Sequence, residues 1–192
     1  MTTFPANATR RIVPVRDADI DQVAALVNRA FSRYSDIFKG SRTSPQDYRD
    51  EVGEDARILL IERDGRLLAT GMVALAERFV ETDQLGPAGT ARPEVIPLLE
   101  ATHPWNGALY FGLAGVEPEL MNGGLGRMLV GHVERLAREE GFPGVALGTV
   151  REFGLVDYYE KLDYRVVHEA EFPVGHWDFI VPHRYCEMVK PV

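Results

Sequence analysis

Short apolar runs separated by turn residues predict most of the strands in this chain. Ala56–Glu62 and Arg66–Leu75 are two apolar runs joined by Arg63-Asp64-Gly65. An Asp-Gly pair between apolar runs predicts a β-hairpin. Other apolar runs of strand length predict the remaining strands: Arg11–Val15, Ala108–Val116, Val145–Val150, Tyr164–His168 and Phe179–Val189.

Apolar residues spaced three and four apart predict amphipathic helices between these strands. Asp19, with Gln22 three residues later, is a typical helix start. The apolar face that follows consists of Ile20, Val23, Ala24, Val27, Ala30 and Phe31. A longer helix with the same spacing begins near Leu125, runs to Glu140 and stops at the Gly141-Phe-Pro-Gly144 segment. Two shorter helices are expected at Gln46–Val52 and Phe153–Leu162.

The element order β-α-(α)-β-β-β-α-β-α-β-β predicts the fold class. It is α/β (α+β), with a mixed, mostly antiparallel central sheet of about seven strands and helices on both faces. A length of 192 residues fits a single domain. Residues 1–9 are expected to be a loose tail. Residues 77–107, rich in Pro and Gly, are expected to be an inserted loop, either functional or a solvated excursion.

The stretch Ala108–Glu140 places a strand, a Gly-rich turn and a helix in direct succession. The N–H groups of a helix's first turn have no partner within the helix, and the helix dipole favours negative charge there. Glycine lets a phosphate approach the backbone closely. This stretch therefore predicts an anion site at the N-terminus of the helix.

The amino-acid composition and net charge limit the classes of partner that this protein is expected to bind. The chain is 45% hydrophobic and 26% charged, as in soluble globular proteins, and its net charge of −8 argues against nucleic-acid or anionic-membrane binding. The single cysteine, Cys186, cannot form an intramolecular disulfide, which favours a reducing compartment. The N-terminus lacks the pattern of a signal peptide, and the longest uncharged central stretch is too short to span a membrane. We therefore expect a cytoplasmic protein.

Several catalytic motifs are missing from the sequence. There is no Gly-Lys phosphate loop, no G-x-S-x-G and no H-E-x-x-H. Leu129 stands where a dinucleotide fingerprint would place its third glycine. Without clustered cysteines or well-spaced carboxylates beside the histidines, no metal site is predicted.

Two segments resemble the GNAT superfamily of N-acetyltransferases. Val116-Glu-Pro-Glu-Leu-Met-Asn-Gly-Gly-Leu-Gly126 resembles its acetyl-CoA signature, V-x-P-x-x-[R/Q]-x-x-G-x-[G/A]. Asp157-Tyr-Tyr-Glu-Lys-Leu-Asp-Tyr-Arg165 resembles its helix-to-strand segment, Tyr-Glu-Lys-Leu-Gly-Phe. The resemblance covers roughly residues 10–190 and implies a single acyl-CoA N-acyltransferase domain over 1–192. It also implies transfer of the acetyl group of acetyl-CoA, as co-substrate, to a primary amine by direct attack.

The resemblance assigns roles to the residues that match. The strand end at Ala114, Gly115 and Val116 would splay from its neighbour, receive the pantetheine arm and polarise the thioester carbonyl with a backbone N–H. Tyr159 would donate a proton to the departing CoA thiolate, with Tyr158 as an alternative acid. Backbone N–H groups would cradle the pyrophosphate at Met121, Asn122, Gly123, Gly124, Leu125 and Gly126.

The sequence departs from the family pattern at three positions. Met121 stands where the pattern has Arg or Gln, and the nearby Arg127 is a candidate to compensate. Glu152 stands where many members have an Asn that contacts the pantetheine, and a carboxylate cannot donate. Asp163 replaces a glycine and tolerates a left-handed backbone better than most residues. Met121 and Glu152 keep open a second hypothesis, an acyl-CoA-binding sensor or module without turnover.

The general base and the acceptor are left open. Base candidates are Glu77, Glu81, His103, Glu117 and the His176-Trp177-Asp178 segment. We expect a small-molecule or peptide amine acceptor, bound by loops 32–50, 77–107 and 172–182. The loop aromatics either line that pocket or pack, namely Tyr34, Phe38, Trp105 and Trp177. The oligomeric state, a homodimer included, is also open.

Overall fold

The structure, a computed structural model, describes residues 8–51, 56–76 and 107–192. Two compact units are present, and each is built from separate stretches of the chain. Unit 1 contains the described residues of Met1–Asp36, Gly40–Val73 and Phe111–Val133. Unit 2 contains those of Ile37–Lys39, Ala74–Tyr110 and Glu134–Val192.

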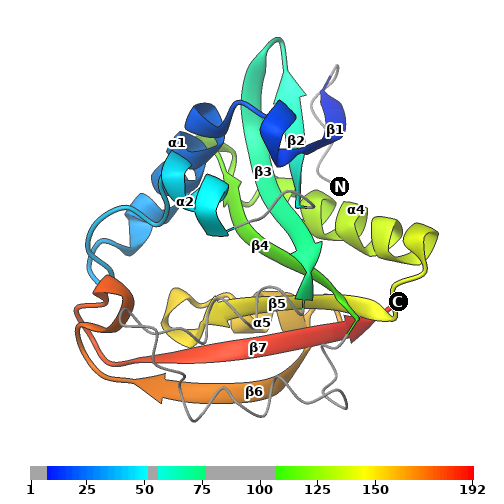
Figure 1. Ribbon diagram of the computed structural model, residues 1–192. Helices are drawn as coiled ribbons and strands as arrows, with labels where there is room; N and C mark the ends of the chain where they lie inside the picture. Colours follow the sequence, from blue (N-terminus) through cyan, green and yellow to red (C-terminus); the bar gives the residue numbers. More distant parts are fainter. Residues whose placement is uncertain (1–7, 52–55, 77–106) are drawn as a thin grey trace. The chain divides into compact units, whose positions relative to one another are not determined.

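Seven strands form one mixed sheet in the order β1-β2-β3-β4-β5-β7-β6 (Figure 1). The pairs β1–β2, β2–β3, β5–β7 and β6–β7 are antiparallel, whereas Leu109 and Tyr110 of β4 pair in parallel with Val145 and Ala146 of β5. The predicted mixed, mostly antiparallel sheet is therefore confirmed. The strands are β1 Thr9–Pro14, β2 Arg57–Arg63, β3 Arg66–Leu75, β4 Leu109–Val116, β5 Gly144–Val150, β6 Arg165–Phe172 and β7 His183–Pro191.

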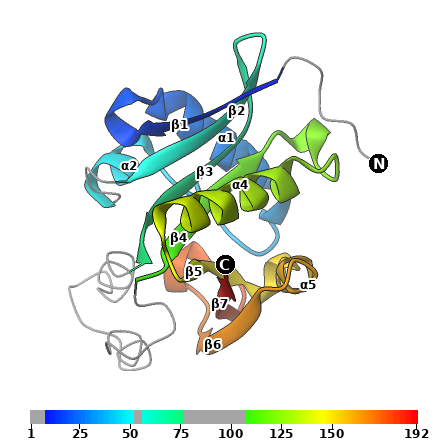
Figure 2. The same cartoon turned by 90° about the vertical axis from the view of Figure 1, so that its right-hand side faces the viewer.

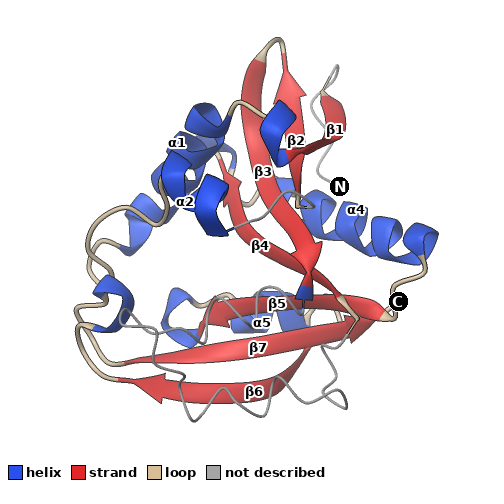
Figure 3. Cartoon of the chain, in the orientation of Figure 1, coloured by secondary structure: helices blue, strands red, loops and turns tan. Residues whose placement is uncertain are grey.

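Helices alternate with the strands in the predicted order (Figure 3). The α-helices are α1 Ile20–Phe31, α2 Pro45–Glu51, α4 Leu125–Glu140 and α5 Val156–Glu160. The 3₁₀ turns are η1 Val15–Asp17, η2 Ser32–Tyr34, η4 Pro118–Leu120, η5 Arg151–Phe153 and η6 His176–Asp178. Within the described ranges, no helix combines the length and the apolar character needed to cross a membrane.

In unit 1, the hairpin and the first helix match the sequence pattern. Asp64 and Gly65 both have positive φ, 53° and 76°, which is the backbone of a type I′ hairpin turn. The Asp19 carboxylate accepts a hydrogen bond of 3.1 Å from the N–H of Gln22 and caps α1. Figures 1 and 2 show α1 and the first half of α4 on opposite sides of this unit's strands.

Helix α1 packs directly on the end of β4, because Gly115 leaves room for it. A Cβ built on Gly115 would lie 3.1 Å from Cα of Val27 and 3.4 Å from Cβ of Ala30. The face of α1 that carries Val27 and Ala30 is buried. Close packing of this kind fixes the strand end that precedes the Gly-rich turn.

In unit 2, three elements differ in extent from the prediction. The strand expected at Tyr164–His168 continues to Phe172, because its pairing with β7 extends to His183. The helix expected at Phe153–Leu162 is shorter, because Gly154 adopts a left-handed φ of 69° and separates η5 from α5. The strand expected at Phe179–Val189 begins only at His183, and Phe179 makes an isolated bridge with Phe38 instead.

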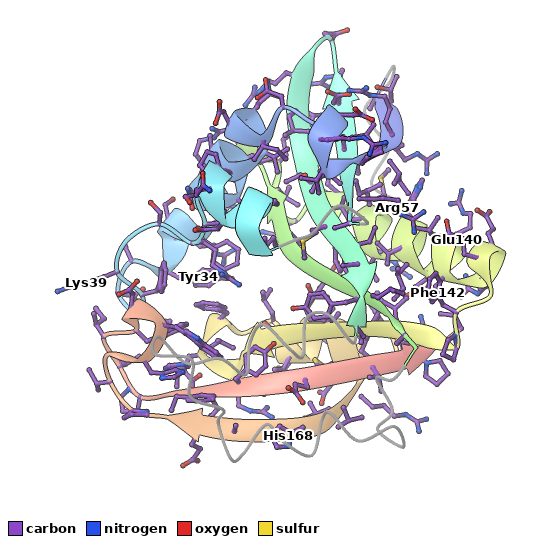
Figure 4. All side chains as sticks on the ribbon, in the orientation of Figure 1. Tyr34, Lys39, Arg57, Glu140, Phe142 and His168 are labelled. Carbon is purple, nitrogen blue, oxygen red and sulfur yellow. The ribbon has the colours of Figure 1, made fainter. Side chains whose placement is uncertain are left out.

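The end of α4 and the turn before β6 agree with the pattern. Helix α4 ends as predicted: Gly141 has a φ of 78°, and the Phe142 N–H donates to Ala137 O at 2.8 Å. Figure 4 labels Glu140 and Phe142 at this helix end. Asp163 takes the left-handed backbone, with a φ of 70°, that its replacement of glycine requires.

Some predictions fall outside the described residues. These are most of the tail, the expected insertion up to residue 106, and four candidate residues: Glu77, Glu81, His103 and Trp105.

Candidate functional site

The end of β4 departs from regular strand geometry just before the residues predicted to receive the acyl group. Leu113 has a φ of 44°, a region that bulky residues rarely occupy. Such a conformation costs about 1–3 kcal/mol and persists where the surrounding structure imposes it. Ala114, Gly115 and Val116 follow immediately and complete the strand. The predicted splaying of this strand end from its neighbour stays a prediction.

Glu117 anchors the turn that follows β4. Its N–H donates to Leu68 O on β3 at 2.9 Å, and its side chain is buried, with 4% of the residue exposed. The carboxylate lies 2.6 Å from the Arg29 guanidinium of α1 and 3.7 Å from that of Arg66. A buried carboxylate held by two cations is a structural anchor, which speaks against Glu117 as the general base.

Hydrogen bonds within the turn shape it from η4 to the start of α4. The Met121 N–H donates to Pro118 O at 3.3 Å, and the Gly123 N–H donates to Leu120 O at 3.1 Å. A Cβ at Gly123 would lie only 2.9 Å from Leu120 O, so the turn leaves no room for a side chain there. Asn122 and Gly124 take positive φ values of 63° and 89°. Successive backbone N–H groups in a turn with positive φ values are typical of anion-binding turns.

Four of the six amides of the predicted phosphate cradle, and the next amide, that of Arg127, make no hydrogen bond within the described residues. The first hydrogen bond of α4 runs from Met128 N–H to Gly124 O, at 3.1 Å. Met121 and Gly123 donate within the turn itself. The amides that meet no acceptor in the described part of the chain are those of Asn122, Gly124, Leu125, Gly126 and Arg127. An anion would satisfy donors that the fold leaves open.

Two arginines flank this turn. Arg127, in the first turn of α4, is exposed and forms no ion pair with any described residue. Arg33, on η2, places Nη1 3.2 Å from the Sδ of Met121. Sequence reasoning missed Arg33 because it lies 88 residues from Met121 and carries no motif of its own. In contrast, Arg66 is already paired with Glu119.

In unit 2, Tyr159 lies on α5 and is half-buried. Its ring makes edge contacts with Tyr158 and Tyr164, at centroid distances of 5.1 and 5.8 Å. Its carbonyl accepts the N–H groups of Leu162 and Tyr164, which fixes the turn into β6. Burial raises the pKa of Tyr164, and the nearby Glu134 carboxylate raises it further. Tyr164 is therefore a structural tyrosine, while Tyr159 keeps its predicted place on the helix.

Glu152 has a structural role that the sequence does not reveal. Its carboxylate accepts the backbone N–H of Arg184 at 2.9 Å and the Arg184 Nε at 3.2 Å. Burial raises the pKa of Glu152, but these donors outweigh it and hold that pKa below its usual value. Glu152 thus ties η5 to β7, a role that requires an acceptor and explains a carboxylate at this position.

The loop aromatics described in the structure pack against other rings. Tyr34 is buried against Phe31, with ring centroids 5.7 Å apart, and Phe38 lies 5.4 Å from Phe179. Trp177 takes a left-handed φ of 49° and packs 5.0 Å from Phe172. Between the two open alternatives, these contacts favour packing.

Neither His176 nor Asp178 can be assigned as the general base from its contacts. The ring of His176 stacks on that of Phe172, with centroids 4.3 Å apart, and Asp178 has a φ of 63°. Over the described ranges, no group of three His, Cys, Asp or Glu residues is arranged to hold a metal ion.

Comparisons with known proteins bear on this arrangement. The sequence matches the Acetyltransferase (GNAT) family over residues 23–164. No curated protein sequence matches the chain.

Several solved structures share the fold. The ribosomal-protein-S18-alanine N-acetyltransferase from Escherichia coli has 13% sequence identity and a TM-score of 0.62, over 96% of this chain and 94% of that one. The Salmonella typhimurium protein yncA, solved with its cofactor acetyl-CoA, has 14% identity and a TM-score of 0.61, over 96% and 93%. The ribosomal-protein-alanine N-acetyltransferase from Brucella melitensis has 14% identity and a TM-score of 0.61, over 96% and 99%. At these identities the similarity shows the fold alone.

Proposed function

Because the chain belongs to the acetyltransferase (GNAT) family and is an acetyl-CoA-dependent acyltransferase, we propose that its acceptor is a primary amine, acetylated by direct attack. The observation that supports acetyl-CoA as the donor in this proposal is the turn before α4. Its amides at Asn122 and from Gly124 to Arg127 have no acceptor in the described residues, and Gly123 has no space for a side chain.

The turn fits the diphosphate of CoA on physical grounds. N–H groups without an intramolecular acceptor at the start of a 16-residue helix are suited to an anion that carries several oxygen acceptors. The backbone of Ala114, Gly115 and Val116 would then hold the pantetheine arm and donate an N–H to the acyl carbonyl. Bound acetyl-CoA supplies an activated acetyl group, because a thioester carbonyl is open to attack by an amine.

Tyr159 would complete the transfer by moving a proton. The neutral amine nitrogen forms a bond to the carbonyl carbon, the carbon–sulfur bond breaks, and Tyr159 gives its phenolic proton to the sulfur. The proton that the ammonium must lose first goes to water or to a base outside the residues argued above. As the amide forms, its nitrogen loses a further proton to solvent, and Tyr159 regains a proton from solvent before the next turnover.

The sensor hypothesis loses one of its two supports. It rested on Met121 and Glu152, and the bonds from Arg184 give Glu152 a structural reason to differ from the family pattern. Met121 still lacks a charged or polar side-chain donor. The sensor hypothesis therefore rests on the phosphate turn alone, where most of the donors are backbone amides.

The test is a screen of small-molecule and peptide amines for release of free thiol from acetyl-CoA. Replacement of Tyr159 by Phe should lower kcat about 10²- to 10⁴-fold, the usual contribution of a positioned acid. Tyr158→Phe, on the same helix, tests the alternative acid: it should stay near the wild-type rate, and a loss of turnover there instead would assign the acid to Tyr158. Unchanged turnover in Tyr159→Phe would remove Tyr159 as the acid. Tight acetyl-CoA binding without thiol release for any amine would favour the sensor.

The partner and location hypotheses rest on charge and pattern. We propose a small-molecule or peptide amine acceptor and no nucleic-acid or membrane partner, supported by the net charge of −8. A cytoplasmic location and a homodimer stay predictions.

A further inference from the structure

In unit 1, the guanidinium of Arg33 contacts a methionine sulfur atom. Arg33 follows α1 directly, on η2, and its Nη1 lies 3.2 Å from the Met121 Sδ. Its side chain is exposed, and no carboxylate of the described residues pairs with it. The neighbouring arginines of the same unit differ, since Arg29 pairs with Glu117 and Arg66 pairs with Glu117 and Glu119.

A thioether is a weak acceptor for so strong a donor. Arginine carries five N–H donors in a planar fork that matches the oxygens of a phosphate, whereas a methionine sulfur accepts weakly. The contact with Met121 therefore leaves most of the donor capacity of Arg33 unused. It also holds the guanidinium beside the turn, which lowers the side-chain entropy lost when a better acceptor arrives.

The position of Met121 in the chain indicates which group is expected to accept hydrogen bonds from Arg33. Met121 stands where the family pattern has Arg or Gln, in the turn whose amides are open to an anion. The amides are dipoles without net charge, whereas a diphosphate carries negative charge that a cation neutralises. Arg33 lies against the very side chain that lacks the donor.

We propose that Arg33 is the side-chain donor to the diphosphate of CoA, and that Met121 positions it there. The missing donor of the turn is thus supplied by a residue 88 positions earlier in the chain. This inference rests on the proposed function, because it assigns the turn before α4 to the diphosphate.

The test is calorimetric titration of the full chain with CoA and with dephospho-CoA, which keeps the diphosphate and lacks the 3′-phosphate. Arg33→Gln should weaken both ligands about tenfold, the factor that 1.4 kcal/mol produces. Arg165→Gln removes one charge from an exposed β6 residue without an ion pair in the described ranges, and should leave both Kd values unchanged.

A second variant separates binding from structure. In Arg33→Gln/Met121→Arg the missing cation returns at the family position, so the affinity for both ligands should return to within about threefold of wild type. Melting temperatures without ligand should match across the set. A merely structural role for Arg33 would give no such rescue.

Results that would contradict the role of Arg33 differ from the result that would contradict the proposed function. An effect of Arg33→Gln on CoA that spares dephospho-CoA would move Arg33 to the 3′-phosphate and overturn the assignment. Unchanged binding of both ligands, or loss without rescue, would overturn it as well. Failure of the wild-type chain to bind either ligand would instead overturn the proposed function.

Discussion

At the scale of single residues, one glycine before α4 and one inside it have opposite steric constraints. Gly123 sits in the turn, where a Cβ would lie 2.9 Å from Leu120 O, a backbone atom with little freedom to move. Gly131 lies inside α4, where a Cβ would meet nothing within 4 Å. The same substitution at these two positions therefore separates turn geometry from helix propensity.

We expect Gly123→Ala to distort the turn. The turn must open to relieve the contact, which should cost about 1–3 kcal/mol of stability and weaken CoA binding, because the neighbouring amides move with it. Gly131→Ala should instead raise stability by up to about 1 kcal/mol, because alanine is the better helix former, with Kd for CoA unchanged. Urea unfolding and CoA titration measure both quantities. Wild-type stability and affinity in Gly123→Ala would refute this account of the turn.

The sequence predicted the positions of single residues correctly where the backbone conformation at that position limits the residue type. Gly124 and Asp163 could be placed in their turns because a positive φ restricts the residue type. The contact between Arg33 and Met121 could not be foreseen, because side chains so far apart in the chain meet only through the packing of α1 on β4.

At the scale of elements, η5 is tied to the last two strands by carboxylates. Glu152 accepts from Arg184 on β7, and Glu169 on β6 pairs with Arg151 on η5 and lies 3.7 Å from Arg184. The hydrogen bond from Arg151 lowers the pKa of Glu169, and the bonds from Arg184 outweigh burial and lower that of Glu152. Both carboxylates are thus more acidic in the folded chain than their usual value of 4.5.

This ion-pair network should make the fold sensitive to acid. A carboxyl whose pKa is lowered by folding adds stability above its unfolded pKa, and that stability is lost as the pH falls through the folded pKa. Unfolding free energy should therefore drop as the pH falls below 4.5. The double variant Glu152→Gln/Glu169→Gln should show a shallower drop in urea titrations across this range.

A matched control comes from the same strand. Glu171 is exposed on β6 and has no ion pair within the described residues, so Glu171→Gln should keep the wild-type pH profile. Equal acid slopes in the double variant and the wild type would show that the network adds nothing to stability.

Element prediction worked where a pattern is self-contained. The β2–β3 hairpin follows from Asp64-Gly65, and the start of α1 follows from Asp19 and Gln22, since both signals lie within a few residues. The start of β7 could not be read in this way. Residues 179–182 are as apolar as a strand, but Phe179 pairs with Phe38, a partner that only the tertiary fold supplies.

At the scale of the whole molecule, three of the described elements run through both compact units. Strand β3 begins in unit 1 and ends in unit 2 with Ala74 and Leu75. Strand β4 begins in unit 2 and ends in unit 1, and α4 begins in unit 1 and ends in unit 2. Neither unit can unfold fully without unravelling an element that the other also uses. The predicted single domain therefore implies a single cooperative unfolding transition.

Calorimetry with and without acetyl-CoA tests this cooperativity and the ligand site together. The calorimetric and van't Hoff enthalpies should agree for one transition. Acetyl-CoA at about 100 times its Kd should add ~2.7 kcal/mol of stability. For a chain of this length, that corresponds to a rise of roughly 5–10 °C in Tm. Because unfolding either unit breaks up the turn before α4 or the helix that bears Tyr159, the whole transition should move as one. Two separate transitions, with only one shifted by ligand, would contradict the single-domain prediction, and no shift at millimolar acetyl-CoA would contradict the ligand site.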